Sequence, residues 1–173
     1  ELYDMAVGIL RLASPSGEAL PPMTGWPDDL RRMIGEHIFM LPGGYEFDGR
    51  DISPFDEAAV RDAARTIRKR GLRAVAVSSV FAPINRAMEV RAAAILREEC
   101  PDAAITLSSE IGRIGFLERE NAAIMNAALA DLAQHLVGSF RFALKEVGIR
   151  APFYISQNDG TLISAEDAAR YPV

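Results

Sequence analysis

The sequence has one cysteine, Cys100, among 173 residues. One thiol cannot form an internal disulfide, so nothing indicates an oxidising compartment. Long apolar runs are also absent, because the longest stretch without a charged residue is Ala74–Asn85, well short of the roughly 18 residues that a membrane-spanning helix needs. The first residues, Glu1–Asp4, are acidic and lack the basic and apolar regions of a secretory signal. These absences predict a cytoplasmic protein without a membrane segment.

Positive charge and the usual catalytic motifs are scarce too. The chain has 19 Lys and Arg against 24 Asp and Glu, a net charge of −5, which is a poor match to nucleic acid phosphates. Its two histidines, His37 and His135, lie far apart, and no zinc-ligand spacing, P-loop, G-x-G-x-x-G or G-x-S-x-G occurs. The sequence therefore predicts no nucleic-acid partner, no metal site and no thiol nucleophile.

The composition that remains is that of a folded domain, with 49% hydrophobic and 25% charged residues. Residues 1–36 are predicted to be an irregular, loop-rich segment because Pro, Gly and Ser are concentrated between Ser14 and Pro27. Residues 37–173 are predicted to form a single α/β domain. Two apolar runs, 38–41 and 45–47, flank a pair of glycines and predict an N-terminal β-hairpin.

Helix and strand patterns alternate after the hairpin. Apolar residues at helical spacing predict helices over about 53–70, 85–100 and 118–147, and short apolar runs predict strands over 74–77, 104–107 and 152–155. A final short helix begins with a Ser164 cap. This alternation predicts an α/β fold with a largely parallel sheet.

Two polar segments follow predicted strands, where ligands bind in many α/β sheets. The first runs through Leu107–Glu110 to Glu118, Arg119 and Asn126, and the second is Ser156–Thr161. Helix capping, ion pairing and turn formation are the alternative explanations of the same residues. The basic residues from Arg61 to Arg73 indicate either a solvated face or an acidic partner. The segment Gly112–Gly115 indicates either a simple loop or a loop that binds an anion.

Short motifs from about Tyr45 to Val173 resemble the hydantoinase A/5-oxoprolinase family in order and spacing. The matching residues are Ala74–Val77, Phe81–Asn85, Glu89, Leu107–Glu110, Glu118-Arg119, Asn126-Ala127, Gln157–Leu162 and Tyr171–Val173.

The resemblance implies an ATP-dependent enzyme that opens a cyclic amide such as hydantoin, N-methylhydantoin or 5-oxoproline. It implies an actin-like ATPase-type fold, ATP and Mg²⁺ as cofactors of the intact parent, a B-type partner subunit and, as a further option, a homo-oligomer. The residues expected to carry catalysis are Glu118, Arg119 and Asp159. Those expected to face substrate or nucleotide are Ser108, Ser109, Glu110, Asn126, Gln157, Asn158, Gly160 and Thr161.

The sequence also departs from the family. Met88, Ala122 and Ala123 replace residues that are often histidine and threonine there, and the phosphate loops expected before and after this stretch are absent. The chain is therefore expected to be an inactive fragment of a longer subunit, with no ATP bound to it alone. Two alternatives stay open: a region of an acetone-carboxylase-type enzyme, and a non-catalytic module that docks a partner subunit.

Overall fold

A computed structural model describes residues 5–157 and 159–173, which form two compact units, a larger one that ends at Ala128 and a smaller one that begins at Leu129. The boundary falls inside the long helix α5 (Phe116–Glu146). This division differs from the expected one at residue 37, because residues before that point belong to the larger unit.

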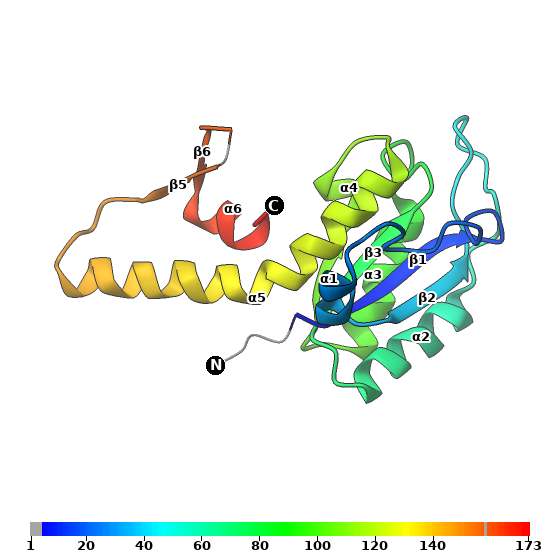
Figure 1. Cartoon of the computed structure of the whole chain (residues 1–173), viewed down its shortest axis with the longest axis horizontal. Coiled ribbons are helices and arrows are strands. Elements are labelled where there is room, and N and C mark those ends of the chain that lie inside the picture. The colour runs from blue at the N-terminus through cyan, green and yellow to red at the C-terminus, as the bar shows by residue number, and fades with distance from the viewer. Residues whose placement is uncertain (1–4, 158) are drawn as a thin grey trace. The chain divides into compact units, whose positions relative to one another are not determined.

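The larger unit is built on a four-stranded parallel sheet with the strand order β2-β1-β3-β4 (Figure 1). Its strands are β1 (Val7–Ser14), β2 (His37–Pro42), β3 (Ala74–Ser79) and β4 (Ala104–Leu107). Helices α1 (Asp28–Ile34), α2 (Glu57–Lys69) and α3 (Ala87–Glu99) connect them, and the one-turn α4 (Ser108–Ile111) follows β4. The prediction of an α/β fold with a largely parallel sheet is confirmed.

Both faces of this sheet are covered by helices. Leu10, Leu12 and Val77 pack with α2 and α3 in one core cluster. Val7 and Ile9 point to the opposite face and pack with α1 and the first part of α5. This alternation is the period-two geometry of a strand, and the double cover makes β1 buried along its whole length.

The assignment of residues 7–14 to an irregular segment is wrong, since they form β1. Arg11 interrupts the apolar run and hides its character as a strand, although the folded chain buries that arginine completely. A charge in a fully buried strand is tolerated only when it is paired.

The predicted N-terminal β-hairpin is also wrong. Strand β2 pairs in parallel with β1, and Tyr45 forms only an isolated bridge with Asp51. Gly43 and Gly44 do not form a two-residue turn. They allow the chain to pass close to Leu12 of β1. A Cβ added to Gly44, whose φ is +91°, would lie 3.0 Å from the Leu12 carbonyl oxygen.

The smaller unit holds the second part of α5, an antiparallel pair of short strands, β5 (Tyr154–Ser156) and β6 (Leu162–Ser164), and α6 (Ala165–Arg170). Ser164 caps α6 as predicted, since its hydroxyl oxygen accepts the Asp167 backbone N–H at 3.0 Å. Strand β6 was not predicted. No helix among the described residues has the length and apolarity needed to cross a membrane.

Candidate functional site

Buried polar side chains gather where the strands of the parallel sheet end. Ser78 and Ser79 close β3, Ser108 follows β4, and Arg119 and Glu120 come from the first turns of α5. In a parallel sheet the carboxyl ends of all strands lie at the same edge. Ligands bind at this edge in many α/β proteins. The buried polar residues of the larger unit are Arg11, Ser14, Ser78, Ser79, Glu89, Thr106, Ser108, Arg119, Glu120 and Asn126.

Arg11 and Glu120 form a buried ion pair in this group. Arg11 Nε donates to Glu120 Oε1 at 2.8 Å, and Nη2 contacts Oε2, so the guanidinium binds the carboxylate with both arms. Ser78 donates its hydroxyl to the same Glu120 Oε1 at 2.6 Å. Both charged side chains are 1% exposed. A pair this well satisfied offsets the cost of removing two charges from water.

Arg119 and Glu89 form a second group, bridged by a serine hydroxyl. Ser108 donates to Glu89 Oε1 at 2.6 Å and accepts from Arg119 Nε at 2.9 Å. The second Glu89 oxygen accepts the Ser109 backbone N–H at 3.0 Å. Arg119 also donates to the carbonyl oxygens of Ser79, at 2.6 Å, and of Arg113, at 2.8 Å.

Burial acts on both charged members of this second group. It raises the pKa of Glu89, although the hydrogen bonds from Ser108 and Ser109 and the charge of Arg119 act in the opposite direction. Burial lowers the pKa of Arg119, while Glu89 and Glu120 oppose that change. Loss of solvation therefore dominates over the attraction between the two side chains.

Three of the predicted site residues come together at this edge, where Ser108, Ser109 and Arg119 meet around Glu89. Asn126, further along α5, is also buried and donates its amide to the Thr106 hydroxyl of β4 at 3.1 Å. Glu110 and Glu118 are exposed instead, and within the described chain no ion pair joins Glu118 to Arg119.

Sequence reasoning missed four members of the two groups: Arg11, Ser78, Glu120 and, as a site residue, Glu89. The signal in the sequence for Arg11 was its position as the one charged residue within an apolar run. Nothing local distinguished Glu120 from its exposed neighbour Glu118, because helical position alone decides which of the two carboxylates faces the sheet.

The second predicted segment lies in the smaller unit, at the turn between β5 and β6. The Thr161 backbone N–H donates to Asp159 Oδ1 at 2.9 Å, and its hydroxyl lies 2.7 Å from the same oxygen and 2.9 Å from Gln157 Oε1. Gly160 donates its N–H to the Gln157 carbonyl at 3.0 Å. The hydrogen bonds from Thr161 lower the pKa of Asp159, which stays ionised near neutral pH. Asn158 lies outside the described residues.

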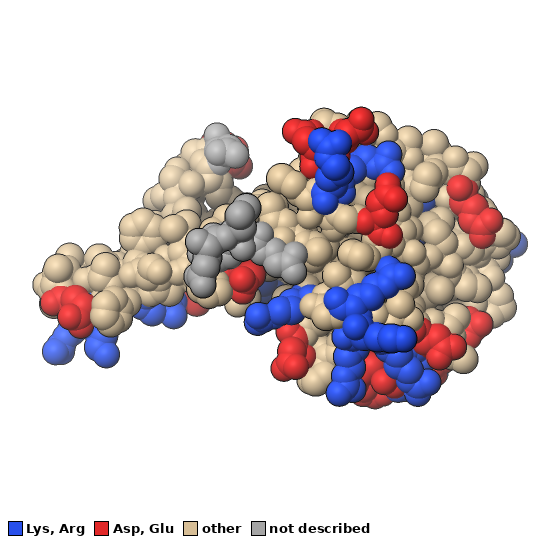
Figure 2. All heavy atoms as spheres, turned by 60° about the horizontal axis from the view of Figure 1, so that its bottom comes forward, with Lys and Arg blue, Asp and Glu red and all other residues tan. Residues whose placement is uncertain are grey.

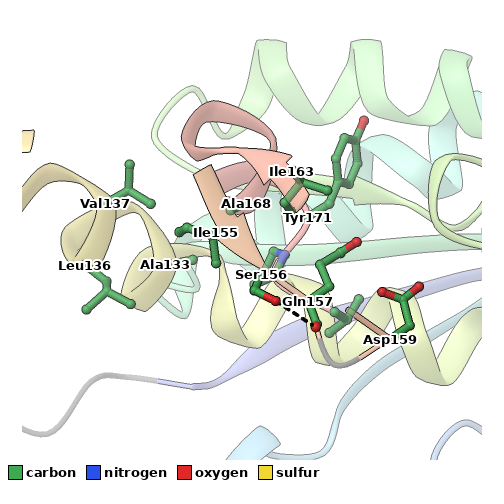
Figure 3. Close-up of a pocket in the computed structure, with 12 residues that line it drawn as sticks. Ala133, Leu136, Val137, Ile155, Ser156, Gln157, Asp159, Ile163, Ala168 and Tyr171 are labelled. Atoms are coloured by element: carbon green, nitrogen blue, oxygen red, sulfur yellow. Dashed lines mark hydrogen bonds between the residues drawn. The ribbon is translucent and has the colours of Figure 1, made fainter. Parts of the chain in front are cut away.

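Gln157 and Asp159 also line a cavity of about 500 Å³ within the smaller unit. Figure 3 shows Ser156, Gln157 and Asp159 at one end of it, and Ala133, Leu136 and Val137 of α5 on the other side. This volume is in the usual range for a small-molecule pocket. Among the described residues, its lining contains one acidic side chain, Asp159, and no Lys or Arg, so its chemistry suits a neutral molecule better than a phosphate.

A basic surface lies on the larger unit, on the side where α2 is found (Figure 2). Arg61 and Arg65 of α2 are engaged with Glu57, Asp62, Glu98 and Glu99. Arg68, Lys69 and Arg73 are exposed and form no ion pair within the described part of the chain. Arg68 and Arg73 border a hollow of about 340 Å³ that also includes Asp102 on its rim.

Comparison with known sequences identifies the family of this chain. Residues 16–100 match the profile described as "Hydantoinase/oxoprolinase N-terminal region", and residues 119–173 match "Hydantoinase/oxoprolinase". The caprolactamase subunit alpha of Pseudomonas jessenii is 31% identical over 137 residues, which are 79% of this chain and 19% of that protein. The acetophenone carboxylase gamma subunit of Aromatoleum aromaticum is 30% identical over 118 residues, 65% of this chain and 16% of that subunit.

A solved structure supports the same relationship. The ATP-dependent caprolactamase from Pseudomonas jessenii superimposes with a TM-score of 0.80 at 25% identity, over 92% of this chain and 25% of that one. The match is consistent with the actin-like ATPase-type architecture expected from the sequence. The chain spans about a fifth of the length of the curated relatives that it matches.

Proposed function

Because the chain belongs to the hydantoinase/oxoprolinase family, we propose that it forms part of an ATP-dependent subunit that hydrolyses a cyclic amide. The observation that carries this proposal is the similarity to caprolactamase, in sequence over 79% of the chain and in fold over 92%. Caprolactam is itself a cyclic amide.

Neither the buried edge of the sheet nor the cavity of the smaller unit fits Mg-ATP. The donors of both buried arginines are directed at protein acceptors, and the described residues contain no group of three or more His, Cys, Asp or Glu placed to hold a metal ion. The cavity of the smaller unit offers a carboxylate where a phosphate would need donors. We therefore propose that ATP binds to other parts of the subunit.

The role proposed for this chain is to supply one wall of the substrate site. Gln157, Asp159, Gly160 and Thr161 are the proposed substrate-facing residues, because their turn borders a cavity with an apolar side and a polar end, the usual composition of a small-molecule site. Asp159→Ala is expected to lower turnover at least about tenfold. Unchanged turnover would remove Asp159 from the site, and the same test applies to Glu118.

The experiment that tests the function is a substrate panel on the subunit that contains this sequence, prepared with its partner subunit. Hydantoin, caprolactam and 5-oxoproline are supplied with Mg-ATP, and ring opening is measured together with phosphate release. We expect phosphate release that depends on one cyclic amide. A second arm supplies acetophenone or acetone with bicarbonate. A carboxylated product, with no ring opening, would overturn the hydrolase in favour of the carboxylase that the second relative represents.

A second candidate function, docking of a partner subunit, is supported by the basic surface. Its exposed cations face solvent in a chain whose net charge is −5, so an acidic protein face is the complementary partner. Arg68→Glu with Arg73→Glu is expected to abolish co-purification with the partner subunit, the B-type subunit being our first choice. Arg50→Glu, an exposed arginine paired locally with Asp48, is the matched control. An intact complex, or loss only of self-association on a sizing column, would exclude this docking mode.

A further inference from the structure

Arg119 is surrounded by protein acceptors on nearly every side. Beyond Ser108 and the Ser79 carbonyl, its Nη1 donates to the carbonyl oxygens of Arg113, at 2.8 Å, and Ile114, at 3.0 Å. Since a guanidinium has five N–H donors, these contacts use four of them, and the residue is 2% exposed. A ligand at this edge of the sheet finds little of the charged group left to bind.

The acceptors of Arg119 identify what it holds. Arg113 and Ile114 lie in the loop between α4 and α5, residues 112–115, and their carbonyls turn inward to the guanidinium. Gly112 is explained by the same contact, because an added Cβ would lie 3.0 Å from Arg119 Cγ. The close approach of Arg119 therefore explains Gly112 without an anion. At Gly115, the other glycine of the loop, an added Cβ would lie 2.7 Å from Glu118 Oε2.

Arg11, on strand β1, repeats this arrangement with a second loop. Its Nη1 donates to the carbonyl oxygens of Leu20 and, at 3.1 Å, of Gly17. Both carbonyls lie in the loop that leaves the carboxyl end of β1. The carboxylates differ in how they contribute: Glu120 binds Arg11 directly, whereas Glu89 reaches Arg119 through the Ser108 hydroxyl.

One aromatic side chain connects the two arginines. Arg11 lies 5.0 Å and Arg119 5.6 Å from the centre of the Phe116 ring, within the distance of a cation–π contact. Phe116 is the first residue of α5. The two loops, the start of α5 and the ends of β1, β3 and β4 are thus joined in one buried network.

We infer that Arg11 and Arg119 are positioning residues, each of which fixes one loop at the carboxyl edge of the sheet, and that Glu89 and Ser108 orient Arg119 for this task. Neither arginine binds a ligand itself. This assignment rests on contacts within the larger unit and not on the proposed function. Only its consequence for catalysis depends on that function. A loop that is no longer fixed must become ordered when substrate or nucleotide binds, so the affinity falls more than the rate of the chemical step.

Trypsin tests the anchoring directly, because Arg113 is exposed and the carbonyl of its scissile bond is the one that Arg119 holds. Cleavage after Arg113 is compared by mass spectrometry with cleavage after Arg50, which lies in another exposed loop outside the network. We expect Arg119→Met to raise the ratio of these two rates about tenfold or more, because charge-assisted hydrogen bonds to the loop are lost. Ser108→Ala is expected to raise it less, and the exposed control Arg97→Met not at all.

The outcomes separate local anchoring from general instability. If Arg119→Met unfolds the chain, cleavage rises at both sites, and the milder Ser108→Ala then decides between the two explanations. An unchanged ratio in a folded Arg119→Met or in Ser108→Ala would overturn the inference. Arg119→Lys is expected to restore the ratio only in part, since one ammonium group cannot reach four separate acceptors.

The enzyme supplies an independent readout. In the intact subunit, Ser108→Ala is expected to raise KM for substrate or ATP severalfold with kcat changed less than about threefold. A purely structural role would lower the amount of active enzyme, and hence the apparent kcat, while KM stays constant. If no cyclic amide is turned over at all, the proposed function fails, but the trypsin result still decides whether these residues anchor the loops.

Discussion

Glu89 shows how far one buried side chain depends on its surroundings. It is fully buried on α3, and its hydrogen-bonded partners are Ser108 and Ser109, with Arg119 as the nearby charge. Burial raises its pKa, so the folded protein holds this proton at a pH where the unfolded chain has released it. The residue therefore links stability to pH.

Glu89→Gln is expected to flatten part of this pH dependence. A raised pKa in the folded state stabilises the protein fully below the ordinary carboxyl pKa, and this contribution is lost as the pH rises through the folded value. Thermal unfolding from about pH 4 to about pH 8, a span that includes the ordinary carboxyl range, checks the expectation. The wild type should lose stability relative to Glu89→Gln as the pH rises. The exposed Glu118→Gln is the control, and a parallel course of wild type and Glu89→Gln would contradict the assignment.

The Arg11–Glu120 pair makes a second prediction at this scale. Removing either partner leaves a buried charge without compensation, so Arg11→Met and Glu120→Leu are each expected to cost about 3–5 kcal/mol of unfolding free energy. The double variant should cost clearly less than the two together, because it leaves no uncompensated charge. Urea denaturation of the four proteins measures the coupling. Strictly additive effects would show that the pair does not act as a unit.

Strand β1 is the element on which the larger unit depends most. It pairs with β2 on one side and β3 on the other, and its side chains enter the core clusters on both faces of the sheet. A strand in this position contributes packing and backbone hydrogen bonds at once, so substitutions in it act on both layers of helices.

A matched pair of leucines tests this position. Leu10 is fully buried in β1, and Leu20 is 52% exposed in the loop that follows. Leu10→Ala is expected to destabilise the protein by about 2–5 kcal/mol through the cavity it leaves, whereas Leu20→Ala should stay within about 0.5 kcal/mol. Chemical denaturation distinguishes the two. Equal effects would mean that residues 7–14 do not form the central strand in solution.

At the scale of the whole molecule, the two units present different chemistry. At the sheet edge of the larger unit, buried polar side chains bind other groups of the protein. In the smaller unit, the described lining of the cavity contains an ionised Asp159 and no Lys or Arg. Neither arrangement provides the donors that a triphosphate needs.

We therefore expect no binding of Mg-ATP to this chain in isolation. Calorimetric titration of the folded 173-residue chain, with circular dichroism to confirm that it is folded, is the measurement. Absence of heat would direct nucleotide studies to the complete subunit. Micromolar binding would contradict the expectation, and variants at Gly112 and Gly160 would then be the first used to locate the site.

The sequence by itself determined the class of fold and the family. Helical and strand periodicities over residues 57–156 correctly predicted α2, α3, α5, β3 and β4, because apolar residues recur in those elements at the spacing of a helix or a strand. Motif order indicated the family, which the comparisons confirm. The buried Ser108, Arg119 and Asn126 were predicted as a polar group because they follow a strand and begin a helix.

Tertiary structure alone decided the rest. Strand β1 was obscured because Arg11 is buried only through a carboxylate 109 residues away, a partner that no local pattern reveals. The glycine pair at residues 43–44 predicted a turn, although the close passage over Leu12 explains it. Whether Glu118 or Glu120 faces inward also depends on how α5 meets the sheet. Long-range pairing and close backbone approach arise only when the chain folds. In the sequence they are visible only as single residues that do not fit the local pattern, such as an arginine in an apolar strand.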